Sequence, residues 1–429
     1  MDEFHPPPLH KMNTTPPRAF QALQEAERGL QALKEAGLIR KQRLSQSACA
    51  TEQMFNGRAY KTFCSNDYLG LANHPAVVQA AQDALGQFGL GSGASHLISG
   101  HHQAHERLAE RLSSFQAAHI PHVQTLTFST GYMANLGVIT ALASLSKVAG
   151  QATDEGTSIY SARLNHASIV DGIRLASRQS RLKLTLFDTE DLQSLETQLM
   201  ADPMGHKLIV CDGVFSMDGH LSPVTALLDL AIRCDALLLI DDAHGFGVLG
   251  EKGHGLLEHL SLNSERLIYM GTLSKAAGGF GAFVCAHQSL CAWLFQKARS
   301  YIYTTALPPS IAAAALQSLD IIEGHEGQTK RAHLNGLIAC WQDTLQLKHW
   351  SKVGSNTPIQ PVVVGKNELC LQLDQTLQSM GYLIPAIRPP TVPLHTARLR
   401  ITFSANHSTE EVQSLAHVLM DLENQVMHP

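Results

Sequence analysis

Residues 237–250 read LLLIDDAHGFGVLG, a segment in which two aspartates and a histidine directly follow a run of apolar side chains. The run Leu237–Ile240 is typical of a β-strand buried on both faces. Asp241 and Asp242 follow at the edge of this core, where a carboxylate costs free energy unless something pairs with it. The segment therefore predicts either a structural ion pair or a cationic ligand beside the aspartates, and by itself it favours neither.

The same alternation of apolar runs and amphipathic stretches extends outward from this segment. Further strands are expected at 125–129, 207–214 and 267–272, each followed or preceded by a stretch with helical periodicity. Uninterrupted apolar strands that alternate with helices predict an α/β fold with a mostly parallel sheet covered on both faces. From about residue 307 the pattern changes to long helices and separate strands, which predicts a smaller C-terminal α+β domain.

The chain therefore divides into four predicted parts. A Pro-rich tail over 1–20 is expected to be disordered, and a helix with an arm covers 21–59. The large domain is expected over 60–305 and the small domain over 306–429.

The composition excludes several classes of function. Only 16% of residues are charged and the net charge is −5, so there is no basic surplus for binding nucleic acid. The eight cysteines form no C-x-x-C pair, which is typical of reduced thiols in a cytoplasmic protein. No apolar run approaches the ~20 residues of a membrane helix, and the N-terminus lacks the apolar core of a signal peptide. We therefore expect a cytoplasmic protein.

Polar side chains follow five of the expected strands at the point where each strand ends. Because ligands bind beyond the carboxyl ends of the strands in open parallel sheets, these positions predict one shared pocket. They are Gly131, His166, Ser216, Asp241 with His244, and Thr272 with Lys275.

These residue types suit one cofactor. A helix that begins at Gly131 offers free backbone N–H groups to a phosphate, and Thr272 can add a hydroxyl. Lys275 can form a Schiff base, and Asp241 can hold a pyridinium proton. The cofactor that needs a phosphate site, a Schiff-base lysine and a carboxylate at a ring nitrogen is pyridoxal 5′-phosphate.

The chain also resembles the α-oxoamine synthase group of fold-type I pyridoxal-phosphate enzymes, from about Gln21 to the C-terminus. This resemblance implies an acyltransferase with a seven-stranded sheet, a smaller C-terminal domain and a homodimeric assembly. The motifs that carry it are SNDYLGL (65–71), GSGASHLISG (91–100), NHASIVDGIR (165–174), GVFSMDGHLSP (213–223), DDAHGFGVLGEKGHG (241–255), GTLSKAAGG (271–279) and IRPPTVPLHTARLRITFSANH (387–407).

Within the group, IRPPTVP together with DDAHG favours the branch that condenses L-alanine with a pimeloyl thioester. The resemblance then implies a decarboxylative condensation that yields 8-amino-7-oxononanoate and carbon dioxide in biotin biosynthesis. The donor is carried on coenzyme A or on an acyl carrier protein. The alternative is a sister enzyme that joins glycine to a short acyl-coenzyme A.

The resemblance assigns roles around the cofactor. Lys275 forms the Schiff base, Asp241 pairs with the ring nitrogen, and His166 stacks on the ring. His244 and Ser216 contact the region of the cofactor's phenolic oxygen. The phosphate is held by Gly131, Tyr132 and Thr272. Thr304 and Thr305 reach the phosphate bound by the partner subunit. Lys275, His166, Asp241 and His244 form the implied catalytic set.

The resemblance also implies a substrate set. Arg400 binds the carboxylate of the amino acid, and Asn66 lies near the acyl substrate or the cofactor. Arg40 and Thr391 line the acyl channel. From the residues alone, Arg398 shares a strand face with Arg400, and Arg40 equally fits a charge at a helix C-terminus.

One further motif raises the question of a metal. The segment HHQAHER places His101 and His105 on one face of a helix, a spacing that can bind zinc. It lacks the glutamate of H-E-x-x-H, and the sequence shows no third ligand. The prediction is therefore that no metal is bound.

Overall fold

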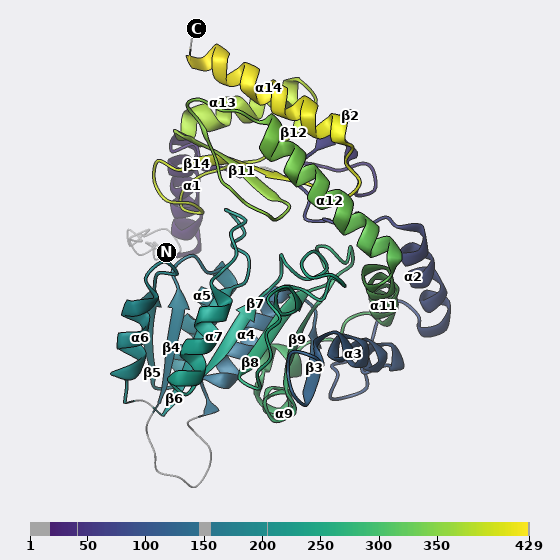
Figure 1. The fold of residues 1–429 in the computed structure, drawn as a ribbon, viewed down its shortest axis with the longest axis vertical. Helices are drawn as coiled ribbons and strands as arrows, with labels where there is room; N and C mark the ends of the chain where they lie inside the picture. The colour runs from purple at the N-terminus through teal and green to yellow at the C-terminus, as the bar shows by residue number, and fades with distance from the viewer. Residues whose placement is uncertain (1–17, 41, 146–155, 204, 428–429) are drawn as a thin grey trace, which may run out of the picture.

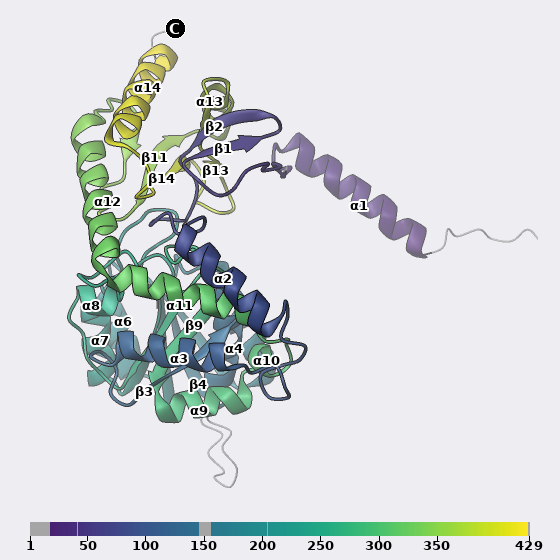
Figure 2. The ribbon, with the colours of Figure 1, turned by 90° about the vertical axis from the view of Figure 1, so that its right-hand side faces the viewer.

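The structure is a computed structural model that describes residues 18–40, 42–145, 156–203 and 205–427. Most of the Pro-rich tail predicted over 1–20 lies outside these residues. The first helix, α1 (Arg18–Glu35), begins at Arg18 and extends away from the body of the molecule (Figure 2). In the described part of the chain, no helix combines the length and the apolar character required to cross a membrane.

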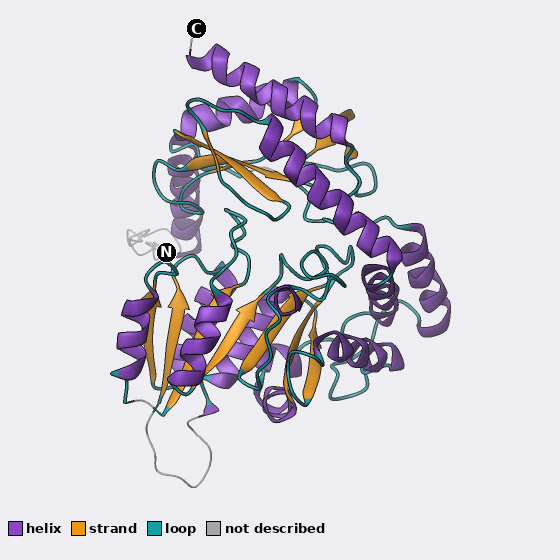
Figure 3. Ribbon diagram, in the orientation of Figure 1, coloured by secondary structure: helices purple, strands orange, loops and turns teal. Residues whose placement is uncertain are grey.

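A seven-stranded sheet forms the centre of the larger part of the molecule (Figures 1 and 3). Its strand order is β3-β9-β8-β7-β6-β4-β5, and all strands except β9 run in one direction. The mostly parallel α/β sheet predicted from the apolar runs is confirmed. The strands are β3 (Val123–Phe128), β4 (Thr157–Ala162), β5 (Leu182–Phe187), β6 (His206–Asp212), β7 (Ala236–Asp241), β8 (Leu267–Thr272) and β9 (Ala282–His287).

The reversal of β9 has a local cause. Only residues 273–281 connect β8 to β9, and this is too short for the crossover that a parallel neighbour requires. Gly278 makes the turn possible: its φ is +67°, and a Cβ there would lie 2.3 Å from the backbone nitrogen of Ala72. The turn holds Lys275 at the carboxyl end of β8.

Helices cover both faces of the sheet because alternate strand residues are apolar on either side. Leu208 and Val210 of β6 belong to one core, whereas Ile209 and Cys211 belong to the other. One face carries α4 (Gly131–Leu142), α5 (Ala167–Gln179), α9 (Gln288–Lys297) and α10 (Arg299–Ile302). The other carries α3 (Gln103–Gln116), α6 (Leu192–Met200), α7 (Val224–Arg233) and α8 (Leu256–His259).

The C-terminal part contains a four-stranded antiparallel sheet with the order β10-β11-β14-β13, packed under helices (Figure 1). The smaller α+β unit predicted beyond residue 307 is present. Its elements are α11 (Pro309–Glu323), α12 (His325–Thr344), β10 (Ser351–Lys352), β11 (Ile359–Gly365), α13 (Asn367–Ser379), β12 (Tyr382–Leu383), β13 (Ala386–Ile387), β14 (Ala397–Thr402) and α14 (Thr409–Met427).

The N-terminal arm joins this C-terminal part. Strands β1 (Glu52–Phe55) and β2 (Arg58–Thr62) form a hairpin, and β2 pairs in parallel with β12. The chain then enters α2 (Pro75–Phe88), and α11 packs against α2 and α3. The exact domain division between 59 and 60 and between 305 and 306 stays a prediction.

Candidate active site

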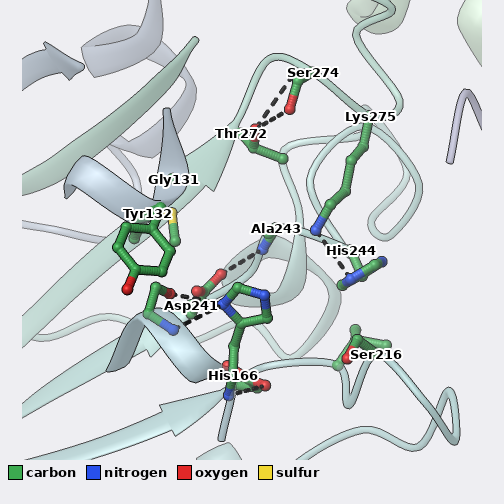
Figure 4. A pocket seen from close by; sticks show the side chains of 14 residues that line it. Gly131, Tyr132, His166, Ser216, Asp241, Ala243, His244, Thr272, Ser274 and Lys275 are labelled. Carbon is green, nitrogen blue, oxygen red and sulfur yellow. Dashed lines mark hydrogen bonds between the residues drawn. The ribbon is translucent and has the colours of Figure 1, made fainter. Parts of the chain in front are cut away.

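A cavity of about 170 Å³ opens at the carboxyl ends of the strands, where the sequence predicted a shared pocket (Figure 4). Its lining includes Gly131, Tyr132, His166, Ser216, Asp241, His244, Thr272 and Lys275 from the predicted site, together with Ser168, Asp212, Val214, Ala243, Met270 and Ser274.

Lys275 is half-buried, and its side chain lines this cavity. Burial lowers its pKa to about 8, while the carboxylates of Asp241 and Asp212 act in the opposite direction. Its Nζ atom lies 2.9 Å from Nε2 of His244. A lysine with a pKa near neutrality is partly deprotonated at physiological pH, so it can act as a nucleophile or a base.

The lowered pKa predicts when Lys275 reacts in cofactor-free protein. Site-resolved reductive methylation should rise through a midpoint near pH 8, about two units below an ordinary lysine, because the neutral amine is the reactive form. In Asp241→Asn the midpoint should fall further, since the Asp241 charge raises this pKa. A midpoint near pH 10 in the native protein would contradict the burial of this amine.

The two aspartates that follow β7 have different surroundings. Asp242 is fully buried, and its Oδ2 atom accepts hydrogen bonds from the Leu256 backbone N–H at 2.7 Å and the Tyr269 hydroxyl at 2.8 Å. Asp242 therefore has a structural role, since its carboxylate bonds to the backbone and to a buried side chain. Burial raises its pKa to about 7.

Asp241 instead faces the cavity. Its Oδ2 atom accepts from the Asn135 amide at 2.7 Å, and Oδ1 accepts from the Ala243 backbone N–H at 3.1 Å. No arginine, lysine or histidine in the described ranges forms a salt bridge with it. Of the two explanations that the sequence left open, the structure thus favours a cationic ligand over an ion pair.

His244 links Lys275 to a chain of hydrogen bonds. Burial lowers the pKa of His244 well below its usual range, so the ring is neutral and carries one proton. With Lys275 donating to Nε2, the Nδ1–H donates to the Tyr68 hydroxyl at 2.6 Å. Tyr68 donates to Oδ1 of Asn66 at 3.1 Å. Each member of the chain then has a partner of the correct polarity.

The chain ends at Arg400. Its Nη1 and Nη2 atoms donate to Oδ1 of Asn66 at 3.3 and 3.4 Å, and its Nε donates to the Ser216 carbonyl at 2.6 Å. Arg398, in contrast, forms an ion pair with Asp218. The structure therefore places Arg400, and not Arg398, beside the residues that line the cavity.

The opposite end of the cavity is formed by the start of α4 and the turn after β8. The Thr130 hydroxyl caps α4 by accepting from the Met133 N–H at 3.2 Å. A Cβ at Gly131 would contact only the Met270 side chain, at 3.6 Å or more, so protein packing does not demand glycine there. A ligand that approaches the backbone closely explains the glycine, and free N–H groups at a helix start suit a phosphate.

Tyr132 and Thr272 are present at this end, but both hydroxyls have protein partners. Tyr132 is 43% exposed and donates to Asp171 at 2.5 Å. The Thr272 hydroxyl donates to the Gly281 carbonyl at 3.0 Å and lies 2.8 Å from the Ser274 hydroxyl. Because the Thr272 proton goes to Gly281, the Ser274 hydroxyl donates to Thr272, and both hydroxyl protons of this turn have partners within the protein.

His166 caps α5 at the cavity edge. The His166 Nδ1 atom accepts from the Ser168 backbone N–H at 3.2 Å, and the backbone N–H of His166 donates to the Asp212 carboxylate at 3.0 Å. Burial lowers the pKa of His166. A neutral ring held in this way suits stacking on a flat heterocycle.

Six predicted residues do not line this cavity. Asn66 and Arg400 lie beside its lining, and the other four lie farther along the surface or the chain. Arg40 and Thr391 are exposed, the former on the arm after α1 and the latter in the loop between β13 and β14. Thr304 and Thr305 lie between α10 and α11 and do not line the cavity.

The sequence reasoning missed Tyr68, Asn135, Ser168, Asp212 and Ser274 as members of the site. A signal existed for Asn135, because a polar amide in the apolar helix GYMANLGVITAL needs a buried partner. No such signal marked Tyr68. Its hydroxyl meets His244 only because residues far apart in the chain come together.

The fold and this set of donors define the class of fold-type I pyridoxal-phosphate enzymes. Over residues 61–419 the chain matches the family model described as aminotransferase class I and II. It is 49% identical to an 8-amino-7-oxononanoate synthase of Janthinobacterium sp. (strain Marseille), over 93% of this chain and 98% of that protein. The chain belongs to the 8-amino-7-oxononanoate synthases of this family.

Solved structures agree with this placement. A serine palmitoyltransferase from S. paucimobilis with bound PLP superimposes with a TM-score of 0.82 at 25% identity, over 95% of this chain and 98% of that one. An 8-amino-7-oxononanoate synthase from Francisella tularensis gives a TM-score of 0.69 at 29% identity, over 86% and 98%.

Proposed function

We propose that this protein catalyses the pyridoxal-phosphate-dependent condensation of L-alanine with a pimeloyl thioester. The products are 8-amino-7-oxononanoate, carbon dioxide and the free thiol carrier, in biotin biosynthesis. The observation that carries the proposal is the placement of the Lys275 amine and the Asp241 carboxylate in one cavity, with the Arg400 guanidinium bonded to the Ser216 carbonyl at its edge. An amine, an acid and a carboxylate-binding cation are what an α-amino acid reaction on this cofactor requires.

When bound, the cofactor supplies an electron-withdrawing ring that acidifies the Cα–H bond of an attached amino acid. Asp241 would hold the proton on the ring nitrogen, because the Asn135 amide and the Ala243 N–H leave its carboxylate oriented toward the cavity. Gly131, Tyr132, Thr272 and Ser274 would surround the phosphate. Ser216 and His244 would face the phenolic oxygen, and His166 would stack on the ring.

Lys275 would take the Cα proton of L-alanine on its Nζ atom. Its lowered pKa makes the neutral amine accessible near pH 8, and His244 accepts a hydrogen bond from the same nitrogen. The Tyr68 and Asn66 contacts orient His244 for this task. Proton transfer by a positioned base accelerates such a step by about 10²–10⁴-fold.

Arg400 would bind the carboxylate of L-alanine until that group leaves as carbon dioxide. Its Nη atoms bond only weakly to Asn66, at 3.3 and 3.4 Å, so a carboxylate can take over these donors. The guanidinium is held in place through its Nε atom and the Ser216 carbonyl.

Arg400→Ala tests this assignment. The KM for L-alanine should rise by about 10–100-fold, because a charge-assisted hydrogen bond contributes about 1.5–3 kcal/mol. The KM for the acyl donor should change far less. Arg398→Lys, which keeps a cation opposite Asp218, is the matched control. Unchanged KM values in Arg400→Ala would show that a group other than Arg400 binds the carboxylate of L-alanine.

We further propose that the protein works as a homodimer in the cytoplasm. Support comes from the two sets of predicted residues that lie outside their own cavity: Thr304 and Thr305, and Arg40 on the exposed arm with Thr391. A second subunit would bring Thr304 and Thr305 to the partner's phosphate, and Arg40 and Thr391 to an acyl channel. All eight cysteines are free thiols, which suits a reducing compartment.

A direct activity assay tests the function. L-Alanine and glycine should be offered in parallel with pimeloyl-coenzyme A, a pimeloyl acyl carrier protein and a short acyl-coenzyme A, and carbon dioxide release measured. The expected result is turnover with L-alanine and a pimeloyl thioester. Preference for glycine and the short donor would instead assign the chain to a sister activity, and the two pimeloyl donors show which carrier is used.

A further inference from the structure

A second cluster of side chains lies outside the active-site cavity, around the start of α3. His96 comes from the loop that precedes this helix, His101 lies just before the helix, and His105 lies in its first turn. One ring nitrogen of each lies within 4.8 Å of the others, and Nδ1 of His96 is 2.9 Å from Nδ1 of His101. The sequence showed only His101 and His105, and the fold supplies His96 as the third imidazole.

The outer nitrogens of two of these rings are anchored. Nε2 of His101 lies 2.9 Å from a carboxylate oxygen of Glu106, and Nε2 of His105 lies 2.6 Å from the Leu307 carbonyl. A carbonyl only accepts, so Nε2 of His105 carries the proton and its Nδ1 atom carries a lone pair. Metal-binding histidines have this arrangement, in which the outer N–H donates to a carboxylate or carbonyl and turns the inner nitrogen toward the ion.

The inner nitrogens have partners that a metal ion can replace. Nδ1 of His105 accepts the His102 backbone N–H at 2.9 Å, and the Nδ1 atoms of His96 and His101 share one proton between them. Zn–N bonds of about 2.0–2.1 Å at tetrahedral angles separate two ligand nitrogens by about 3.3 Å. His96 and His101 would therefore move slightly apart, and the third ring would move inward.

The protonation state of the cluster also suits a cation. Burial and the neighbouring imidazoles lower the pKa of His96 to about 3, and burial lowers the pKa of His105 as well. Both rings are thus neutral at pH 7, the form that binds metal. His96 is further held by stacking on Tyr301, with ring centroids 4.9 Å apart and planes 4° from parallel.

We propose that His96, His101 and His105 form a binding site for a borderline divalent transition-metal ion such as Zn²⁺, with water in the fourth position. Three imidazoles suit Zn²⁺ and disfavour Mg²⁺, which prefers oxygen ligands. The ion would join the loop that carries His96 to the start of α3, next to the 301–307 segment that His105 and His96 already contact. Two hydrogen bonds already connect these regions. The Ser92 hydroxyl donates to the Leu307 carbonyl at 2.6 Å, and the Ala306 N–H donates to the Ala94 carbonyl at 3.0 Å.

The test is equilibrium dialysis of the tag-free holoenzyme against Zn²⁺, followed by metal analysis. The native chain should bind one Zn²⁺ that the double variant His96→Gln, His101→Gln binds at least tenfold more weakly. His325→Gln, which removes an exposed imidazole from the start of α12, should bind as the native chain does. Glu106→Ala should weaken binding by about 10–100-fold, because the carboxylate orients His101.

Two additional measurements keep the outcome interpretable. Thermal unfolding without metal should be similar for the native chain and the double variant, and added Zn²⁺ should raise the midpoint of the native chain alone. Co²⁺ in place of Zn²⁺ should lack thiolate charge-transfer bands, which excludes binding by the free cysteines. Equal Zn²⁺ binding by the native chain and the double variant, including none by either, would overturn the site.

Discussion

Lys275→Ala is expected to lower kcat/KM by about four orders of magnitude or more, since it removes both the Schiff-base nitrogen and the proposed base at Cα. The cavity around it should persist, because the turn over 273–281 is held by backbone bonds such as Leu273 N–H to the Gly281 carbonyl at 2.9 Å. The native protein should be yellow, and borohydride should fix the cofactor covalently on Lys275. Peptide mass spectrometry of reduced native and variant protein checks this directly.

The matched control is Lys252→Ala, which truncates an exposed lysine in the loop after β7. This variant should keep the colour, the reducible cofactor and full activity. A borohydride adduct on a lysine other than Lys275 in the native protein would contradict the assignment. So would a Lys275→Ala variant that turns over substrate at near-native rate.

Asp241→Asn carries the second-largest expected effect. The variant should retain the cofactor, because Lys275 and the phosphate end of the cavity are unchanged. It should lose about 10²–10³ in kcat, since a buried electrostatic contact that stabilises developing charge is usually of that size. The amide cannot hold a proton on the ring nitrogen as the carboxylate does. The expected signature is slow exchange of the Cα proton of L-alanine in D₂O without any acyl donor.

Asp235→Asn serves as the control for this change. Asp235 lies just before the opposite end of β7, is largely exposed, and pairs with Arg266 at the surface. Its replacement should leave Cα exchange and turnover unchanged, because exposed ion pairs contribute little. Native exchange in Asp241→Asn would show that Asp241 does not hold the ring nitrogen.

Much of the sheet was predictable because its strands are buried on both faces. Such strands must be continuous apolar runs, and these runs stand out at 125–129, 207–214, 236–240 and 267–272. The sites at their ends followed from the same rule, which is why eight predicted residues line one cavity. The antiparallel direction of β9 was not visible, because it depends on the conformation of the turn that holds Gly278.

Local sequence patterns could not predict which residues distant in sequence form hydrogen bonds or ion pairs with the site residues. Asp241 and Asp242 are adjacent and of the same residue type. Asp242 accepts hydrogen bonds from Leu256 and Tyr269, whereas Asp241 faces the cavity. Arg398 and Arg400 share a strand face, but Arg398 pairs with Asp218 whereas Arg400 bonds to Asn66 and the Ser216 carbonyl. In each pair the decision rests on a hydrogen bond or ion pair with a residue distant in sequence.

The amino-acid sequence by itself thus determined the layered α/β architecture, the edge where the site forms and the chemistry of its lysine and aspartate. Periodic burial and strand ends are properties of short segments, so they can be read locally. The tertiary structure alone decided that Tyr68 meets His244, that Asn135 orients Asp241 and that His96 completes a triad with His101 and His105. These contacts exist because packing brings together side chains whose separation along the chain carries no information about their distance in space.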